Sequence, residues 1–399
     1  MKHVIIGVGA AGITAAETIR KNRKEDEIVM ISTDDTVISR CMLHKYIGGE
    51  RSEEELSFVP KDFFESNKIS WIKGKEVTEI DTSSKRVIFE GGGESYDKLL
   101  IATGAKSFFV PIVGLDEASN VYGLRDLSDA KAIRERAAKA NHIVIIGAGL
   151  IGLDAAYALT EMGKKPIIID MAPHVLSANL DERAAATYQS KFEEKGCKFY
   201  FGSKISKVQQ DSASNITSVI LDDKEELPCD LLIMAVGVRP NNSLLPNTTA
   251  DEYLSIQKDV YVAGDVSALS ENWPSAVTQG ELAALNMCSI ATYYNEERIL
   301  RNTINFFGIA SLSIGCLKPE PEDICEMRED KNRYQKVIIR DGIPVGVVLQ
   351  GDVSRSGFWQ HIIKNKVKVC DAPKSIWKTS FANSYGINED GEYEWVALI

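Results

Sequence analysis

The sequence lacks long apolar runs and has fewer basic than acidic side chains. No stretch approaches the roughly 18 consecutive apolar residues that cross a bilayer, and the first residues enter an apolar strand without a cleavage-type signal. The 46 basic and 57 acidic side chains give a net charge of −11, which argues against nucleic acid or an anionic membrane as the main partner. These absences predict a cytoplasmic protein that binds small ligands or a docking protein.

Metal-binding and dithiol patterns are also missing. The seven cysteines are scattered, no two have Cys-x-x-Cys spacing, and the five histidines lack ligand spacing. We therefore expect no metal site, no thioredoxin-like motif and a reducing compartment. Six of the cysteines are interpreted as core or incidental thiols: Cys197, Cys229, Cys288, Cys316, Cys325 and Cys370.

A glycine motif occurs twice in the chain, whose 399 residues predict two to four domains. Each copy has the form Gly-x-Gly-x-x-Gly and stands between an apolar strand and a helical stretch. The copies are Gly7-x-Gly9-x-x-Gly12, which includes Ala11, and Gly147-x-Gly149-x-x-Gly152, which includes Ile151. Such glycines permit a tight turn, close approach of the backbone to a pyrophosphate, and close packing of helix on strand. Two copies in this context predict two dinucleotide-binding units.

The acidic residue that follows the motif differs between the two units. In the second unit Asp170 ends the next strand, eighteen positions after Gly152. A carboxylate there hydrogen-bonds a ribose 2′-hydroxyl and repels a 2′-phosphate, so the sequence predicts NADH over NADPH. In the first unit Ser32 stands at the equivalent position, with Asp34 and Asp35 just beyond it. The usual acidic ribose ligand of the first unit is therefore absent or displaced.

Three further motifs carry a resemblance to a known family. They are Leu100-Ile101-Ala102-Thr103-Gly104, Ala235-Val236-Gly237-Val238-Arg239-Pro240-Asn241 and Val260-Tyr261-Val262-Ala263-Gly264-Asp265. With the two glycine motifs, they resemble the crossover and second FAD motifs of the FAD-dependent pyridine nucleotide reductases. The resemblance implies FAD in the first unit, with Asp265 on the ribityl chain, and NADH as co-substrate in the second.

The similarity is strongest to one branch, which comprises the NADH:rubredoxin reductases, the ferredoxin reductases and the nitrite reductase flavoproteins. It is carried by the segments 124–130 and 273–280, by Phe307-Gly308, and by Gly346 to Asp352. The implied cofactor-binding residues outside the glycine motifs are Arg40, Ala102, Thr103, Gly104, Arg125, Asp170, Gly237, Gly264, Asp265 and Gln279. Arg125 is expected at the FAD phosphates and Gln279 at the flavin pyrimidine end.

The resemblance also implies a fold and its domain boundaries. We expect an α/β protein with two Rossmann-like domains that bind FAD and NAD, the second inserted in the first, plus a C-terminal α+β domain. The FAD-binding domain would comprise residues 1–110 and 237–302, the NAD-binding domain residues 111–236, and the C-terminal domain residues 303–399. The segment between Asn241 and Asp259 is shorter than the family suggests.

One segment is expected beside flavin N5. Arg40-Cys41-Met42-Leu43-His44-Lys45 matches the Arg-Pro-x-Leu-Ser-Lys pattern of ferredoxin reductase-like proteins at its first, fourth and sixth positions. By that resemblance Lys45 pairs with Asp154, which occupies the place of the family's glutamate. Aspartate is one methylene shorter, so a direct and a water-bridged contact both stay open. The alternative is that both residues are surface charges.

Cys41 allows two interpretations. Its spacing to Tyr46-Ile47-Gly48 resembles the redox-active cysteine of NADH peroxidases, NADH oxidases and coenzyme A-disulfide reductases, and cations facing it would favour the reactive thiolate. The surrounding pattern, however, belongs to the electron-transfer branch, where an apolar residue fills this position. Cys41 is therefore either redox-active or a packed, inert thiol.

The sequence predicts an FAD-dependent NADH:acceptor oxidoreductase that passes electrons to a small redox protein such as rubredoxin or a ferredoxin. Two alternatives remain: a Cys41-dependent peroxidase, oxidase or disulfide reductase, and a flavin-bearing redox sensor or complex subunit. No nucleic-acid or membrane partner is expected, and the protein is expected to be a monomer or a homodimer.

Overall fold

The computed structural model describes residues 1–116, 118–246, 248–269, 272–295, 301–369, 376–381 and 385–395. Internal contacts divide the chain into two compact units. Unit 1 comprises Met1–Pro111, Asn120–Ala140 and Ile233–Asn295, and unit 2 comprises Ile112–Ser119, Asn141–Leu232 and Glu296–Ile399.

Unit 1 is built on a six-stranded sheet with the order β18-β19-β7-β1-β2-β3. The strands are β1 (Lys2–Ile6), β2 (Glu27–Ile31), β3 (Ile69–Ile72), β7 (Lys98–Ile101), β18 (Ser255–Gln257) and β19 (Val260–Val262). The central strand β1 runs parallel to both of its neighbours, and it ends in the buried apolar run Val4-Ile5-Ile6. A continuous apolar run is typical of a parallel strand that is covered on both faces.

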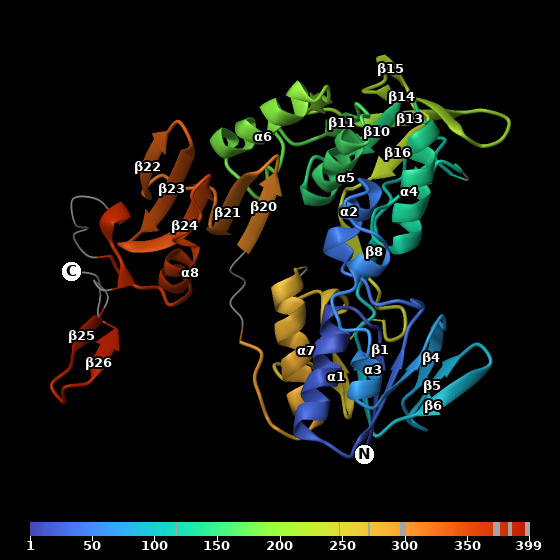
Figure 1. The fold of residues 1–399 in the computed structure, drawn as a ribbon, viewed down its shortest axis with the longest axis vertical. Coiled ribbons are helices and arrows are strands. Elements are labelled where there is room, and N and C mark those ends of the chain that lie inside the picture. Colours follow the sequence, from blue (N-terminus) through green and yellow to red (C-terminus); the bar gives the residue numbers. More distant parts are fainter. Residues whose placement is uncertain are drawn as a thin grey trace. The chain divides into compact units, whose positions relative to one another are not determined.

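Helices α1 (Ala10–Asn22) and α7 (Trp273–Met287) lie side by side in unit 1 (Figure 1). Their close approach depends on Gly280, since a Cβ atom at this position would lie 2.3 Å from the carbonyl oxygen of Ala11. Helix α7 starts at Trp273, because the side chain of Asn272 accepts a hydrogen bond from Ser275 N and so caps the helix.

Unit 1 contains several smaller elements besides this sheet. A meander consists of β4 (Val77–Asp81), β5 (Arg86–Phe89) and β6 (Gly92–Ser95), and a two-stranded ribbon consists of β8 (Ala105–Ser107) and β17 (Val238–Pro240). The remaining helices and strand are α2 (Leu43–Ile47), α3 (Phe63–Ser66), α4 (Leu127–Lys139), β9 (Val121–Tyr122) and the 3₁₀ turns η1 (Arg40–Met42), η2 (Glu54–Leu56) and η3 (Asp265–Ser267).

Unit 2 contains a second Rossmann-like sheet and an antiparallel C-terminal sheet. The first has the order β12 (Lys198–Phe201), β11 (Ile167–Asp170), β10 (Ile143–Ile146), β16 (Leu231–Met234), β9. It is accompanied by α5 (Leu150–Glu161), α6 (Glu182–Glu194) and the meander β13 (Ile205–Gln210), β14 (Ile216–Leu221), β15 (Glu225–Pro228). The second has the order β20 (Arg301–Phe306), β21 (Ile309–Gly315), β24 (Ile343–Gln350), β23 (Arg333–Arg340), β22 (Ile324–Asp330). It is followed by α8 (Ser356–Lys364), η4 (Ile376–Lys378), β25 (Tyr385–Ile387) and β26 (Tyr393–Trp395).

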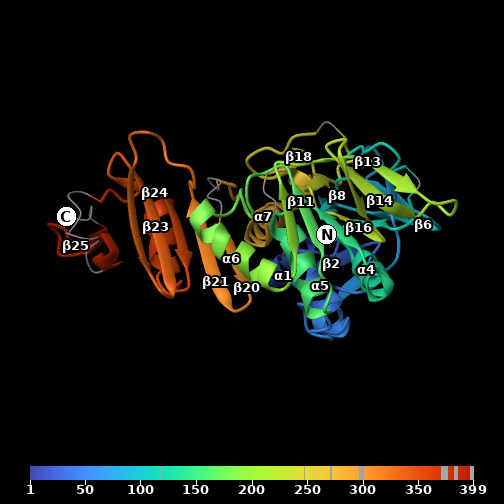
Figure 2. The same ribbon diagram turned by 90° about the horizontal axis from the view of Figure 1, so that it is seen from above.

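Helix α6 lies beside β20 and β21 (Figure 2). The buried hydroxyl of Tyr188 donates to Ile309 O at 2.7 Å and lies 2.8 Å from the Ser311 hydroxyl. Burial raises the pKa of Tyr188 to about 12, so the hydroxyl keeps its proton at neutral pH. This contact joins the C-terminal sheet to helix α6 within unit 2.

The predicted fold class is confirmed: two Rossmann-like sheets are followed by an α+β domain with an antiparallel sheet. The domain boundaries drawn from the sequence stay predictions. Within the part of the chain that the structure describes, no helix is long and apolar enough to cross a membrane.

Asp259 anchors the β19 end of the unit 1 sheet and provides a pH-dependent contribution to stability. Its carboxylate lies 2.6 Å from Lys85 Nζ and 2.6 Å from Lys98 Nζ, and these two partners lower the pKa of Asp259 to about 2. The folded pKa lies below the unfolded value of about 3.9, so the stabilisation is present above pH 4 and disappears as the pH falls toward 2.

We expect Asp259→Asn to lower the free energy of unfolding by about 1 kcal/mol at pH 7. Urea unfolding should show the difference from the wild type shrinking with acidification.

Candidate functional site

A cavity of about 400 Å³ opens in unit 1 at the carboxyl ends of β1, β2, β7 and β19. The ends of parallel strands are where open α/β sheets bind ligands. Eleven of the residues predicted from the sequence line it: Gly7, Gly9, Ala11, Arg40, Cys41, Ala102, Thr103, Gly104, Arg125, Gly264 and Asp265. Segments far apart in the sequence thus meet around one cavity.

The first glycine motif forms one wall of the cavity. Helix α1 begins with Gly9 as its N-cap, and no side chain caps its free N–H groups, which leaves them available to an anion. A Cβ atom at Gly9 would have no neighbour within 4 Å, whereas one at Gly12 would lie 2.1 Å from Gly7 O. Gly9 therefore borders open space, and Gly12 permits the helix to pack on the strand.

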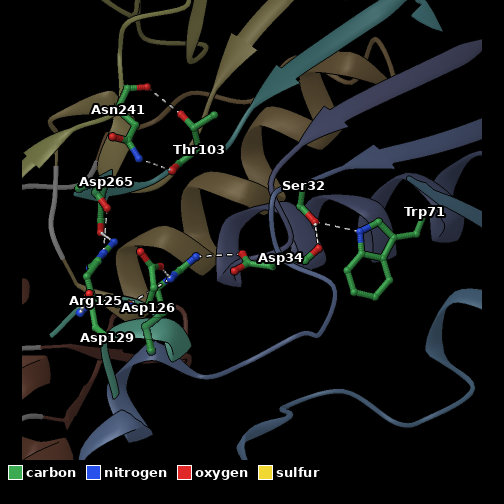
Figure 3. A network of polar contacts seen from close by, with 11 residues as sticks. Ser32, Asp34, Trp71, Thr103, Arg125, Asp126, Asp129, Asn241 and Asp265 are labelled. Atoms are coloured by element: carbon green, nitrogen blue, oxygen red, sulfur yellow. Dashed lines mark hydrogen bonds and ion pairs between the residues drawn. The ribbon is translucent and has the colours of Figure 1, made fainter. Parts of the chain in front are cut away.

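A ladder of three hydrogen bonds joins the two crossover motifs beside the cavity, and Figure 3 shows the two that link Thr103 and Asn241. The Thr103 hydroxyl donates to Asn241 O at 2.9 Å, Asn241 Nδ2 donates to Thr103 O at 3.1 Å, and Asn241 N donates to Gly104 O at 2.9 Å. The sequence analysis did not assign Asn241 to the site, although it ends the second crossover motif. Gly237, which was assigned, adopts a φ of +106° and does not line the cavity.

Arg125 and Asp265 form an ion pair in the cavity wall (Figure 3). Arg125 Nη2 lies 2.6 Å from Asp265 Oδ2, and Arg125 Nε donates to Ala105 O at 2.9 Å. The two side chains are only 17% and 15% exposed, so the pair is little screened by solvent. The pair places a guanidinium and a carboxylate, which carry opposite charges, on the same wall.

Arg40 is held between two carboxylates from different segments. Its guanidinium contacts Asp34 Oδ2 at 3.0 Å and the Asp126 carboxylate on its other side. Burial raises the pKa of Asp34, while the charge of Arg40 opposes that shift. Asp126 also begins α4, in a reciprocal capping box with Asp129. The sequence identified Arg40 but neither of its partners.

Ser32 and Asp34 occupy the end of β2, where the sequence showed a departure from the usual acidic ligand. The buried Ser32 hydroxyl donates to Asp34 O at 2.7 Å and accepts from Trp71 Nε1 at 3.0 Å (Figure 3). Both Ser32 and Asp34 line the cavity. The usual acidic position is thus occupied by Ser32, and the carboxylate at this end of the cavity belongs to Asp34, two positions later in the chain.

Cys41 is exposed and lies on η1 in the cavity wall. Of the neighbouring cations, Arg40 is paired with two carboxylates, and Lys45 Nζ lies 2.6 Å from Glu50 Oε2. Burial, assisted by the charge of Lys45, lowers the pKa of His44 to about 4, so its imidazole is neutral at pH 7. These pairings weaken the electrostatic argument for a reactive thiolate. The predicted pair between Lys45 and Asp154 joins residues of different units and stays a prediction.

Gln279 stabilises the turn at Gly264 in the cavity wall. Its side chain is fully buried, and its Oε1 accepts hydrogen bonds from Gly264 N at 2.8 Å and from the Ser267 hydroxyl at 2.9 Å. The amide thus holds the turn that presents Asp265. Its predicted contact with a flavin stays a prediction.

The second glycine motif, in unit 2, is tied to the end of its neighbouring strand. The Asp170 carboxylate accepts from Ala148 N at 2.5 Å and from Ala172 N at 2.7 Å. Gly149 is the N-cap of α5 and has no side-chain cap, and a Cβ atom there would have no neighbour within 4 Å. In this motif Gly147 has a φ of +105°, Ile151 is half-buried and Gly152 is buried. The loop therefore has the open backbone and the acidic residue that a dinucleotide needs.

The remaining described thiols lie apart from both glycine motifs. Burial raises the pKa of Cys197 and of Cys229 to about 12 and also raises the pKa of Cys288. Cys316 and Cys325 are half-buried, and Cys370 lies outside the described residues. The three buried thiols are protonated at neutral pH and hence poor nucleophiles.

Comparisons with known proteins agree with this arrangement. A model of the pyridine nucleotide-disulphide oxidoreductase family matches residues 1–280, and a model of the rubredoxin NAD⁺ reductase C-terminal domain matches residues 301–367. The chain is 26% identical to a nitrite reductase [NAD(P)H] of Bacillus subtilis over 93% of its own length and 48% of that enzyme, so it spans about half the length of this curated relative.

Two further relatives are shorter. A rubredoxin-NAD(+) reductase of Pseudomonas putida is 28% identical over 73% of this chain and 81% of that protein. The crystal structure of a covalent putidaredoxin reductase–putidaredoxin complex shares the fold, with a TM-score of 0.82 and 23% identity over 92% of this chain and 94% of that chain. The predicted resemblance to rubredoxin, ferredoxin and nitrite reductase flavoproteins is confirmed. Because the first match covers more than half of the sequence, this chain belongs to the pyridine nucleotide-disulphide oxidoreductase family.

Proposed function

We propose that this protein is an FAD-dependent NADH:acceptor oxidoreductase whose acceptor is a small redox protein such as rubredoxin or a ferredoxin. The observation that carries the proposal is the cavity of unit 1. There the uncapped start of α1, the crossover residues and the pair Arg125–Asp265 surround one space of about 400 Å³.

The residues of this cavity fit FAD. The open backbone at Gly9 accommodates a pyrophosphate at the start of α1, and Arg40 and Arg125 add positive charge to the walls. Asp265 offers a carboxylate to a ribityl hydroxyl, and Asp34 offers one at the end of β2. When bound, FAD supplies an acceptor for the hydride of NADH and a donor of single electrons.

The residues of the second glycine motif fit NADH. The uncapped start of α5 receives a pyrophosphate, and Asp170 receives the ribose hydroxyls at the end of β11. Lys45 and Asp154 are proposed to orient the reacting rings, and the protein is proposed to act as a monomer or a homodimer.

The class of acceptor is supported by the C-terminal domain. Residues 301–367 match the C-terminal domain of rubredoxin NAD⁺ reductases, and the Pseudomonas putida relative carries that activity in its name. A second candidate function is reduction of peroxide, oxygen or a small disulfide by Cys41. It is favoured by one observation, which is that Cys41 is exposed in the cavity wall.

An anaerobic titration with NADH separates the two functions. If the flavin is the only redox centre, we expect the absorbance near 450 nm to be bleached completely by about one NADH per FAD, in the wild type and in Cys41→Ser alike. An oxidised Cys41 accepts two further electrons, so about two NADH per FAD in the wild type and one in the variant would support the second function. Loss of menadione reduction in Cys41→Ser would also contradict the first function, in which the flavin is the only redox centre.

A further inference from the structure

The ribbon β8–β17 carries two cations directly opposite each other. Arg239 on β17 is the register partner of Lys106 on β8, and opposed residues of an antiparallel pair project their side chains to the same face. Like charges in this arrangement destabilise the pair of strands. A negatively charged ligand or partner at this face would remove the repulsion.

Neither cation is neutralised from within the described chain. Arg40, Lys45 and Arg125 each contact a carboxylate, whereas the described residues offer no ion pair to Lys106 or Arg239, and both side chains are exposed. Among the described residues, the guanidinium of Arg239 donates a hydrogen bond only to the neighbouring backbone, at Val238 O. The ribbon is therefore a local site of unbalanced positive charge on a chain whose net charge is −11.

Two aromatic side chains accompany these cations. The guanidinium of Arg239 lies 4.1 Å from the ring centre of Phe108, which is a cation–π contact. The next residue, Phe109, is 44% exposed. Arginine and aromatic residues are the types enriched where proteins dock on each other. We call the four residues Lys106, Phe108, Phe109 and Arg239 the ribbon patch.

The ribbon patch is joined rigidly to the cavity. Lys106 itself lines the cavity, the Thr103–Asn241 ladder binds both strands at their cavity end, and Arg125 Nε holds Ala105 O. A protein seated on the patch would thus lie at the rim of the cavity proposed to hold the flavin.

We propose that the ribbon patch is the docking surface for the acidic face of the small redox protein that takes electrons from this enzyme. The inference rests on the proposed function. The net negative charge of the chain repels an acidic redox protein at a distance. The positive charges of Lys106 and Arg239 attract the acidic face of that protein and so favour the orientation in which it docks beside the cavity. Such attraction is screened by salt within about 10 Å at 0.1 M ionic strength.

The test compares Arg239→Glu with Lys24→Glu, which makes the same charge change at an exposed lysine after α1. NADH-dependent reduction of an acidic [2Fe–2S] ferredoxin is followed at low and high salt, with uncharged menadione as the reference acceptor. For Arg239→Glu we expect the KM for ferredoxin to rise about tenfold at low salt and to approach the wild-type value at high salt. Menadione turnover should not change. Lys106→Glu together with Arg239→Glu should raise this KM further.

Three results would overturn the proposal. Equal ferredoxin KM values in Arg239→Glu and Lys24→Glu would mean that the carrier docks elsewhere. A rise in the KM for NADH of similar size in Arg239→Glu would assign the cation to the pyridine nucleotide. If the wild-type protein reduces menadione but neither ferredoxin nor rubredoxin, the proposed acceptor itself is wrong. This third result therefore contradicts the proposed function, whereas the first two contradict only the proposed docking surface.

Discussion

Replacing Gly9 by alanine is expected to leave the fold intact and to weaken FAD binding, whereas replacing Gly12 by alanine is expected to destabilise the fold. The new methyl group at Gly9 meets no protein atom within 4 Å, so it enters only the space proposed for the pyrophosphate. At Gly12 it would lie 2.1 Å from Gly7 O, and α1 would have to move away from β1. We expect a loss of about 3 kcal/mol in unfolding free energy for Gly12→Ala and less than about 0.5 kcal/mol for Gly9→Ala.

These two variants should be compared by thermal unfolding of the flavin-free proteins and by titration with FAD. We expect Gly9→Ala to raise the Kd for FAD by about tenfold to a hundredfold, because the backbone can no longer approach the phosphates closely. Wild-type FAD affinity in a stably folded Gly9→Ala protein would show that the cofactor does not bind at the start of α1. Unchanged stability of Gly12→Ala would contradict the packing argument.

Removal of the charge of Asp170 is expected to shift the enzyme from NADH toward NADPH. In the proposed NADH site this carboxylate would repel a 2′-phosphate and accept hydrogen bonds from the ribose hydroxyls, and in the structure it accepts from Ala148 N and Ala172 N. The two groups donate to different oxygens of the carboxylate, so Asp170→Asn removes the charge and keeps an oxygen acceptor for one of them, whereas Asp170→Ala removes the charge and both acceptors. We expect the ratio of kcat/KM for NADPH to that for NADH to rise about tenfold or more in Asp170→Asn.

The measurement is steady-state turnover with each nucleotide and menadione, on protein with full FAD content. Asp170→Ala should show the same change of preference with a larger loss of overall kcat/KM, since the glycine loop loses its anchor. A preference that stays the same in both variants would mean that the ribose does not reach Asp170. Gly149→Ala is a suitable control, because it should weaken the binding of NADH and of NADPH equally.

Local spacing in the sequence was sufficient to predict the two glycine motifs and the elements around them. The turn, the helix start and the strand that precede a pyrophosphate site all lie within about thirty residues, and their glycines are required by local geometry. The fold class followed from the duplication of this unit. The resemblance of the segment Arg40 to Lys45 implied a place beside flavin N5, which stays a prediction, and the structure places Cys41 in the cavity wall.

Only the tertiary structure decided which charges meet. Arg40 contacts Asp126 from 86 positions away, Arg125 contacts Asp265 from 140 positions away, and Thr103 bonds Asn241 from 138 positions away. Such pairs depend on how the crossover strands return to the sheet and on the register in which β8 meets β17, and neither is encoded in any one segment. The same register brings Lys106 and Arg239 together. The sequence by itself determined the two glycine motifs between a strand and a helix, and tertiary packing decided that Arg40 and Arg125 are paired with carboxylates while Lys106 and Arg239 have no ion pair among the described residues.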